Sequence, residues 1–387
     1  MDVADRSGPP AETRGTSVSY HPGMTATPTT PANRLGIDYR REAASFGTPT
    51  VPIVDAHTHI NGTEAVEVFR DAMDLYGVES VWSMTTLEMV DDVRRRLDGR
   101  MEPIAVPDFR AKDRLHAHGE GYLERIRAYR DLGARLVKFW SAPRIVDIGA
   151  ESGDPAMFRL DGPMRRAGME LAVELGMGIM IHVADPDTWF RTKYADASVY
   201  GTKLEQYEPL EAVLRDYQVP FMVAHMGGWP EDLDFLGGLL TRHPLLHLDA
   251  SATKWIVREV SRHEPAKVRG FLDRWRGRIL FGSDIVTLDS HLESEGEASD
   301  NEMDRKAGSL AEAFDLYASR YWALRTLWET GYDGESPIAD PDLALVDPEH
   351  HSELDAPRLR GMDVPEATLV DFYRDAARGL AAKLPLA

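Results

Sequence analysis

The sequence of 387 residues contains no cysteine. Disulfide bonds and thiolate metal sites are therefore excluded, and a transition metal can be held only by histidine, aspartate, glutamate or a modified lysine. Long apolar runs are also missing, since the best one, residues 175–181, is far below the roughly 18 residues that a membrane span needs. The N-terminus shows no basic segment followed by an apolar stretch, so we expect no secretory signal and a cytoplasmic protein.

Positive charge is scarce: 44 Lys and Arg stand against 64 Asp and Glu, for a formal net charge of −20. Such a field repels nucleic acid and anionic membrane surfaces, so we expect neither as a partner. Much of the excess lies in residues 289–304 and 333–355, which we interpret as solvated acidic surface. The hydrophobic fraction of 43% is that of an ordinary globular protein.

The amino-acid composition and the pattern of apolar residues change near residue 46. Residues 1–45 are rich in Pro, Thr, Ser and Gly and predict a flexible tail, followed by one domain over residues 46–387. In that domain, continuous apolar runs predict strands buried on both faces, and they alternate with amphipathic helices. The predicted strands are 51–56, 80–85, 102–107, 135–140, 178–182, 220–225, 245–250 and 278–283. The predicted helices are 63–76, 87–97, 119–132, 162–175, 204–217, 230–242 and 257–275.

Eight strands alternating with helices predict an α/β fold, the (β/α)8 TIM barrel. A doubly wound sheet is the alternative, but no glycine-rich phosphate loop follows the first strand. A long insertion, residues 286–360, follows strand eight on the face where barrels keep their active sites, and we expect it to be a lid or a contact of a homodimer. Its predicted helix, 310–330, carries aromatic residues that we interpret as packing: Phe314, Tyr317, Tyr321, Trp322 and Trp328. A last helical stretch covers residues 365–384.

The first strand ends in Asp55-Ala56-His57-Thr58-His59. Side chains two apart on a strand point to the same side, so Asp55, His57 and His59 are expected to project into the barrel. Two inward imidazoles can bind one divalent cation. The spacing alone means little, because His116 and His118 repeat it without a preceding apolar strand; we assign that pair to a solvated loop.

Three other strands also end in ligand-type residues. The fifth ends at His182, the sixth at His225, and the eighth at Asp284. These are the ends at which barrel enzymes place catalytic groups. An unpaired buried histidine or aspartate is costly, whereas one metal ion would satisfy all of them.

These motifs resemble those of the amidohydrolase superfamily: Asp-x-His-x-His, then two histidines, then Gly-Ser-Asp on the last strand. The HMGG sequence at residues 225–228 and FYRDAAR at residues 372–378 resemble its amidohydrolase-related branch. That branch includes aminocarboxymuconate semialdehyde decarboxylase, aromatic-acid decarboxylases and dicarboxylate lactonases. The resemblance runs from about Val51 to Leu380 and is specific for the superfamily, not for a substrate.

The resemblance implies that His57, His59, His182 and Asp284 ligate one Zn²⁺ or similar ion. It implies His225 as general base or acid beside a metal-bound water, whose pKa such an ion lowers to about 7. An imidazole with an unperturbed pKa of about 6.5 suits that proton transfer. Asp284 can equally orient the water, which makes it a catalytic candidate as well as a ligand.

Lys138 on the fourth strand leaves the number of metal ions open. Other superfamily members carry a carboxylated lysine there, bridging two metals, and His225 would then be a ligand. The branch resemblance favours one metal, with Lys138 binding a substrate anion or pairing with an inner carboxylate.

Tryptophans and basic residues near the strand ends predict the pocket. Rigid aromatic walls suit a flat or apolar ligand, so we expect an aromatic or cyclic small molecule as substrate. The tryptophans are Trp140, Trp189, Trp229 and Trp255. The candidate cations for a substrate carboxylate are Arg110, Lys138, Arg144, Arg191, Lys193 and Lys254.

The sequence therefore predicts a metal-dependent hydrolase whose activated water attacks a small cyclic or aromatic amide, lactone or acid. The first alternative is a non-oxidative decarboxylase of an aromatic or unsaturated carboxylic acid, since the same metal site can serve either reaction. The second is a barrel without activity that acts as a binding protein. Absence of bound metal and of metal-dependent ligand binding would favour the last.

Overall fold

The structure, a computed structural model, describes residues 29–293, 303 and 306–386. Its centre is a parallel sheet in which each strand pairs with the next along the chain, in the order β8-β7-β6-β5-β4-β3-β2-β1-β9. The strands are β1 (Ile53–Ile60), β2 (Val78–Ser83), β3 (Met101–Ala105), β4 (Leu136–Trp140), β5 (Gly178–His182), β6 (Phe221–Val223), β7 (Leu246–Asp249), β8 (Ile279–Leu280) and β9 (Ile285–Thr287). They are almost wholly buried, as expected of strands covered on both faces.

The two ends of this order belong to one stretch of chain. β8 pairs with β7, while β9 pairs with β1, and only four residues separate β8 from β9. The ladder is interrupted there, but the Phe281 carbonyl accepts from the Ala56 N–H, and the Asp284 N–H donates to the His57 carbonyl. Residues 279–287 thus contact both the last and the first strand, and the predicted (β/α)8 fold is confirmed.

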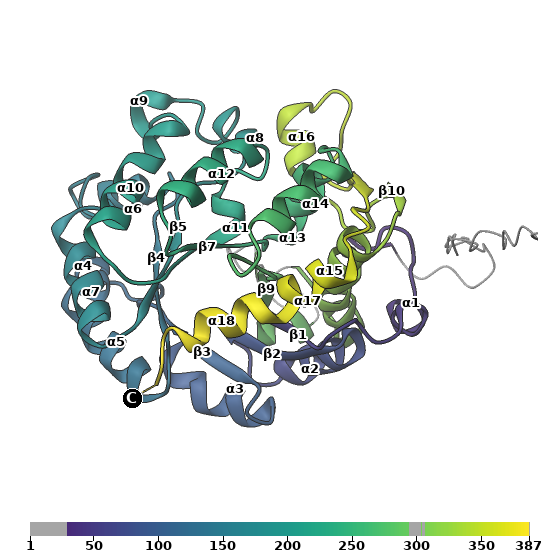
Figure 1. Ribbon diagram of the computed structural model, residues 1–387, viewed down its shortest axis with the longest axis horizontal. Helices are drawn as coiled ribbons and strands as arrows, with labels where there is room; N and C mark the ends of the chain where they lie inside the picture. Colours follow the sequence, from purple (N-terminus) through teal and green to yellow (C-terminus); the bar gives the residue numbers. More distant parts are fainter. Residues whose placement is uncertain (1–28, 294–302, 304–305, 387) are drawn as a thin grey trace, which may run out of the picture.

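Helices surround the strands (Figure 1). They are α2 (Ala65–Tyr76), α3 (Val90–Arg96), α4 (Arg114–His118), α5 (Glu120–Asp131), α6 (Ile145–Glu151), α7 (Pro163–Glu174), α8 (Asp187–Phe190), α9 (Ala197–Tyr200), α10 (Tyr207–Asp216), α11 (Ala224–Gly227), α12 (Leu233–Arg242), α13 (Thr253–Val260) and α14 (Pro265–Arg274). Single turns η1 (Leu87–Met89) and η2 (Leu204–Gln206) precede α3 and α10. The one helix predicted for 257–275 is wrong: it is two, because Pro265 begins α14 and cannot continue a helix from α13.

The insertion after strand eight supplies part of the barrel wall. Its long helix α15 (Leu310–Glu329) packs against α2, α1 and α13, and its five predicted aromatic residues are buried, so their packing role is confirmed. Before it stands η3 (Asp289–Leu292), and after it the β10 (Asp333–Glu335) and β11 (Arg358–Arg360) hairpin encloses α16 (Asp342–Val346). Of the predicted acidic segment 289–304, residues 294–302 and 304 lie outside the described residues.

The chain ends in α17 (Glu366–Val370), a π turn η4 (Asp371–Asp375) and α18 (Ala376–Ala382), close to the predicted 365–384. At the other end, residues 1–28 of the predicted tail lie outside the described residues. Helix α1 (Tyr39–Phe46) begins within the predicted tail. It packs on α15 and α2 because Tyr39 and Ala43 share one buried face. No helix in the described part of the chain is long and apolar enough to cross a membrane.

Candidate metal centre

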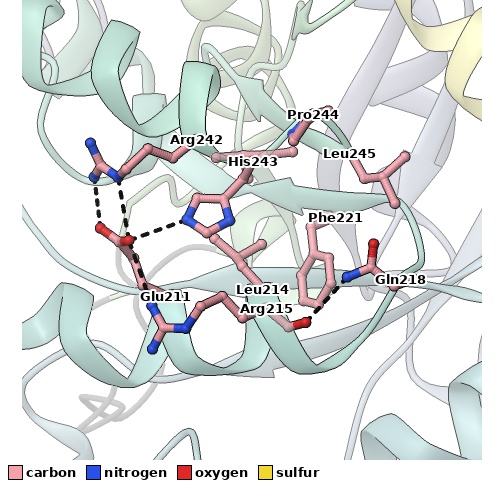
Figure 2. Close-up of a pocket in the computed structure, with 10 residues that line it drawn as sticks. Glu211, Leu214, Arg215, Gln218, Phe221, Arg242, His243, Pro244 and Leu245 are labelled. Carbon is pink, nitrogen blue, oxygen red and sulfur yellow. Dashed lines mark hydrogen bonds and ion pairs between the residues drawn. The ribbon is translucent and has the colours of Figure 1, made fainter.

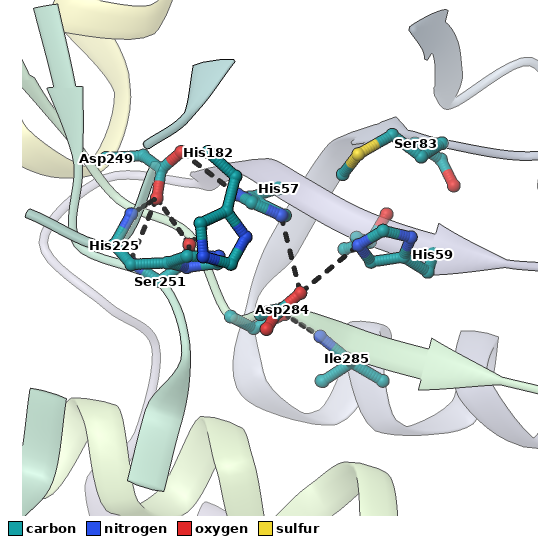
Figure 3. Close-up of polar contacts among 12 residues, drawn as sticks. His57, His59, Ser83, His182, His225, Asp249, Ser251, Asp284 and Ile285 are labelled. Atoms are coloured by element: carbon teal, nitrogen blue, oxygen red, sulfur yellow. Dashed lines mark hydrogen bonds and ion pairs between the residues drawn. The ribbon is translucent and has the colours of Figure 1, made fainter. Parts of the chain in front are cut away.

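Three of the predicted ligands meet between the end of β1 and the loop that joins β8 to β9. His57 and His59 both lie on β1, and the Nε2 atom of each is 3.3 Å from Asp284 Oδ1 (Figure 3). The ligand atoms of the three residues all lie within 4.8 Å of one another. Two imidazoles and one carboxylate converging in this way form the donor set that zinc and related divalent ions use.

The hydrogen bonding of His57 fits a metal ligand. Its Nδ1 lies 2.9 Å from Asp249 Oδ2, and because the carboxylate can only accept, Nδ1 carries the proton. Nε2 is left as an acceptor, and it is buried without a hydrogen-bond partner. Carboxylates that hold the far nitrogen of a histidine are the usual support of histidine metal ligands. The residues present therefore fit a divalent ion.

Asp249 and Ser251 were missed by the sequence reasoning. Asp249 closes β7, and its Oδ1 accepts from the backbone N–H groups of His225 and Ser251, at 3.0 and 3.2 Å, and from the Ser251 hydroxyl. Ser251 Oγ in turn lies 2.9 Å from His57 Nδ1. One signal could have revealed them, because Asp249 and Ser251 are two apart after an apolar strand, as at the other strand ends.

His225 is oriented by the same pair. Its Nδ1 lies 2.8 Å from Ser251 Oγ, and because that hydroxyl donates to Asp249, it accepts from His225. The proton therefore lies on Nδ1, and Nε2 keeps its lone pair. The His225 ring centroid is 4.8 Å from that of His57 and 4.5 Å from that of His182. An imidazole nitrogen with a free lone pair thus lies beside the cluster.

His182 closes β5 as predicted, but its ligand atoms are not within the group formed by His57, His59 and Asp284. Its Nε2 lies 2.8 Å from Asp185 Oδ1, and Tyr194 Oη donates to the other oxygen of Asp185 at 2.6 Å. The ring is adjacent to His225, so the fourth predicted ligand is near the others without joining them in this structure.

Backbone strain is concentrated at this site. Six non-glycine residues in the described part of the chain have positive φ, and four belong here: His225 (57°), Met226 (51°), Ala252 (65°) and Asp284 (59°). Side chains disfavour this conformation, and it persists mainly at functional sites. It also ends β6 at Val223, two residues before the predicted end.

Gly282 allows the eighth strand segment to approach β1. A Cβ there would lie 2.9 Å from the Ser251 Cβ, closer than real Cβ atoms come, and 3.0 Å from the His57 Cβ, which is also tighter than most real contacts. Within the Gly-Ser-Asp sequence, glycine is therefore required for Asp284 to reach the histidines.

The charges of the cluster favour a cation. Burial would raise the pKa of Asp284, but the neighbouring His57, His59 and His225 hold it well below its ordinary value. Burial, and next the neighbouring His182, lower the pKa of His225 well below its ordinary value. At neutral pH the site thus combines a charged carboxylate with a neutral imidazole, the protonation states in which both groups bind or serve a metal.

Lys138 faces the same cluster from β4 and is 4% exposed. Burial lowers its pKa to about 8, although the charges of Asp249 and Asp284 act in the opposite direction. Its position beside both carboxylates agrees with either predicted role, and its function stays a prediction.

Two of the four predicted tryptophans contact the histidines, and a third packs against one of those two. Trp140 pairs in register with His182, and their rings meet edge to face at 6.4 Å. The centre of the Trp255 ring lies 5.6 Å from that of His225 and 6.3 Å from that of His182. The centre of the Trp189 ring lies 5.1 Å from that of Trp255. The fourth, Trp229, packs instead against Tyr207 and Phe235 at 5.7 and 4.6 Å.

The predicted cations contribute less to the centre. Arg110, Arg144 and Arg191 are exposed, and Lys254 is half-buried next to Trp255. Lys193 lies 3.3 Å from the centre of the Trp189 ring. The histidine pair His116 and His118 is only half solvated: His116 is exposed, but His118 is buried against Phe158 and Arg165. The predicted solvated loop is therefore wrong for His118, because these residues form α4 and its last turn packs inward.

A separate hollow lies at the opposite ends of the strands (Figure 2). Its volume is about 400 Å³, and it lies between α10, α12 and the starts of β6 and β7. Glu211 there is paired with Arg242 at 2.7 Å and with His243 at 3.2 Å. Its acidic and basic groups are thus paired with one another, unlike the histidines at the other end.

The amidohydrolase family model matches residues 48–316. No curated protein matches the sequence at a significant level.

Several solved structures are similar over most of their length. A 2,6-dihydroxybenzoate decarboxylase complexed with 2,6-dihydroxybenzoate is 13% identical, with 85% of this chain and 99% of that chain covered and a TM-score of 0.43. A dihydroxybenzoic acid decarboxylase from Polaromonas sp. JS666, with bound manganese and 2-nitroresorcinol, is 13% identical over 69% and 97%, with a TM-score of 0.39. A 5-carboxyvanillate decarboxylase from Novosphingobium aromaticivorans, complexed with manganese and 4-hydroxy-3-methoxy-5-nitrobenzoic acid, is 12% identical over 77% and 94%, with a TM-score of 0.38.

Proposed function

The chain belongs to the amidohydrolase family, and on that premise we propose that it is a metal-dependent enzyme that decarboxylates a small hydroxyl-bearing aromatic acid. The observation that carries the proposal is the buried, unpartnered Nε2 of His57, aimed at the same Asp284 oxygen as His59. Such a cluster is costly without a cation. The indole rings of Trp140 and Trp255 beside the histidines favour a planar ring as the substrate.

We assign one Zn²⁺ ion to His57, His59 and Asp284, with His182 as the fourth ligand. The three-nitrogen, one-oxygen donor set suits zinc, and a bound divalent ion supplies Lewis acidity toward a hydroxyl, a carbonyl or a water. The position of the His182 ring, 4.5 Å from that of His225, supports its inclusion. Asp249 holds His57 in the tautomer that leaves Nε2 free to ligate.

His225 moves the proton in this proposal. Its Nε2 takes the proton of the substrate hydroxyl and returns it to the ring carbon that bears the carboxylate. The bond from that carbon to the carboxylate then breaks and CO₂ leaves; the electron pair restores the aromatic ring as a phenolate, which takes a proton from solvent. Ser251 supports this role because it accepts from Nδ1 and keeps the lone pair on Nε2.

Hydrolysis of a cyclic amide or lactone is the second candidate. The same donor set suits activation of water, and the same Nε2 can accept the proton of that water. His225 carries the proton in either reaction, so the two reactions are distinguished by which substrates the protein converts.

Lys138 is assigned to the carboxylate of the substrate rather than to a second ion. Lys138 is buried beside two carboxylates, which supports this role, because its ammonium group could then pair with the carboxylate of a substrate as well. Two ions per chain in the purified protein, falling to one in Lys138→Ala, would instead indicate a carboxylated lysine that bridges two metals.

The test uses the full chain loaded with Zn²⁺ and a set of hydroxybenzoates, cyclic amides and lactones. We expect CO₂ release from a hydroxybenzoate, and a loss of at least about 100-fold in turnover for His225→Asn with its metal content unchanged. Product only from amides or lactones would support hydrolysis. A protein that binds no metal, or a His225→Asn variant with full turnover, would contradict the proposal.

A further inference from the structure

The segment after strand eight reaches the site through one carboxylate. Asp342, the first residue of α16, accepts from the indole N–H of Trp189 at 2.8 Å and from that of Trp255 at 3.2 Å. Trp189 lies on α8 after strand five, and Trp255 lies on α13 after strand seven. Asp342 therefore ties together two βα connections that are far apart in sequence.

Asp342 is itself held in place. Arg258 Nη1 lies 3.3 Å from its Oδ2 and also pairs with Asp340, and Arg258 is only 6% exposed. Lys193 Nζ lies 3.7 Å from its other oxygen. A buried carboxylate with these partners is a fixed acceptor, not a group that is available to a ligand.

The tie determines which part of the indoles remains for a ligand. Both indole N–H groups donate to Asp342, so neither is free to bind a ligand, and each ring can offer a ligand only its carbon surface. Trp255 meets the His225 ring at an interplanar angle of 85° and the Trp189 ring at 79°. Edge-to-face pairs of this kind hold aromatic side chains in one orientation.

We propose that Asp342 is a positioning residue that holds Trp189 and Trp255 as the wall of a subsite for the aromatic ring of the substrate. The proposal rests on the proposed function for the location of the reacting atoms beside His225. It goes further in naming Asp342, and with it the insertion after strand eight, as the element that fixes the aromatic wall and so sets the specificity for a ring. The ring is recognised by stacking on apolar surface, without a hydrogen bond from the indoles.

The test compares benzoate with acetate as probes on the Zn²⁺-loaded full chain, by titration calorimetry. Both carry one carboxylate, but only benzoate has a ring. In Asp342→Asn we expect benzoate binding to weaken about fivefold, the effect of losing one good hydrogen bond, while acetate binding stays unchanged. Asp347→Asn removes an equal charge from the end of α16, at an exposed side chain, and should leave both affinities as in the wild type.

Trp189→Phe is the second variant, because it removes one N–H while leaving Asp342 paired with Arg258 and Trp255. It should also weaken benzoate binding without an effect on acetate, and metal content should equal that of the wild type in every variant. Equal losses for benzoate and acetate, or none in Asp342→Asn, would overturn the proposal. A wild-type protein that prefers benzoate to acetate but releases no CO₂ from any hydroxybenzoate would contradict the proposed reaction and leave the ring subsite standing.

Discussion

The two ends of the barrel contain similar residue types, but their side chains differ in whether they have partners. At the end where the strands stop, His57 keeps a buried nitrogen without a partner, and His225 and Asp284 have strained backbones. At the end where they start, His243 and Arg242 both pair with Glu211 around a hollow of about 400 Å³. The size of a hollow is thus a poor guide to function here, and unsatisfied, strained polar groups are a better one.

The largest effect is expected for His59→Asn, which removes a proposed metal ligand whose side chain is 31% exposed. Metal affinity should fall by more than about 100-fold. That value is the upper range for loss of a residue that only hydrogen-bonds to a ligand, and loss of a ligand itself should cost more. Measurement of bound metal and circular dichroism on the purified protein would show loss of metal with the fold retained. His116→Asn is the matched control, an exposed histidine of the other His-x-His pair, and an equal loss there would break the comparison.

Asp249→Asn should have the next largest effect, because it weakens the group that orients His57 without removing a proposed ligand. A fall of about 10-fold to 100-fold in metal affinity is expected, as for other carboxylates behind a histidine ligand. Competition with a chelator measures it. Unchanged affinity would mean that the tautomer of His57 does not depend on Asp249.

A pH-dependent effect should separate the two ends. Burial raises the pKa of Glu231, in the loop after β6, to about 7, although the charge of Lys203 acts in the opposite direction. At the other end of the barrel, the pairing of Glu211 with Arg242 and His243 outweighs the effect of burial and lowers the pKa of Glu211. Between about pH 4.5 and about pH 7 the folded protein holds the Glu231 proton that the unfolded chain has lost, so this residue makes stability fall as pH rises through that window.

Thermal melts of Glu231→Gln from pH 5 to pH 8 test this expectation. The variant should gain stability relative to the wild type as pH rises toward 7 and keep that gain above it. A difference in melting temperature that is constant with pH would contradict the raised pKa.

The smallest effect is expected for Glu211→Gln. Its arginine partners Arg242 and Arg215 are 48% and 62% exposed, and exposed ion pairs contribute about 1 kcal/mol or less. A glutamine can still hydrogen-bond its third partner, His243, whose side chain is 9% exposed. The melting temperature should fall by no more than about 2 °C, with metal content and turnover unchanged. A large loss of turnover would show that the hollow communicates with the metal site.

The convergence of the candidate ligands could be predicted from the sequence because each one stands at the end of an apolar run. His57, His59 and Asp284 meet as expected, and the fold follows from alternating strands and helices. Asp249 has the same local signal, but its role could not be predicted, because it acts through a hydrogen bond to a residue 192 positions away. His118 shows the opposite error, since its spacing and lack of a preceding strand suggested solvent while its ring packs against Phe158.

The sequence by itself determined which residue types stand at each strand end, since strand period and apolar runs are local properties of the chain. Only the tertiary structure decided which nitrogen of His57 is free, which tryptophans face the histidines, and that Asp342 joins two tryptophans. Those outcomes depend on contacts between distant segments, and such contacts arise only when the strands are side by side and the insertion packs on them.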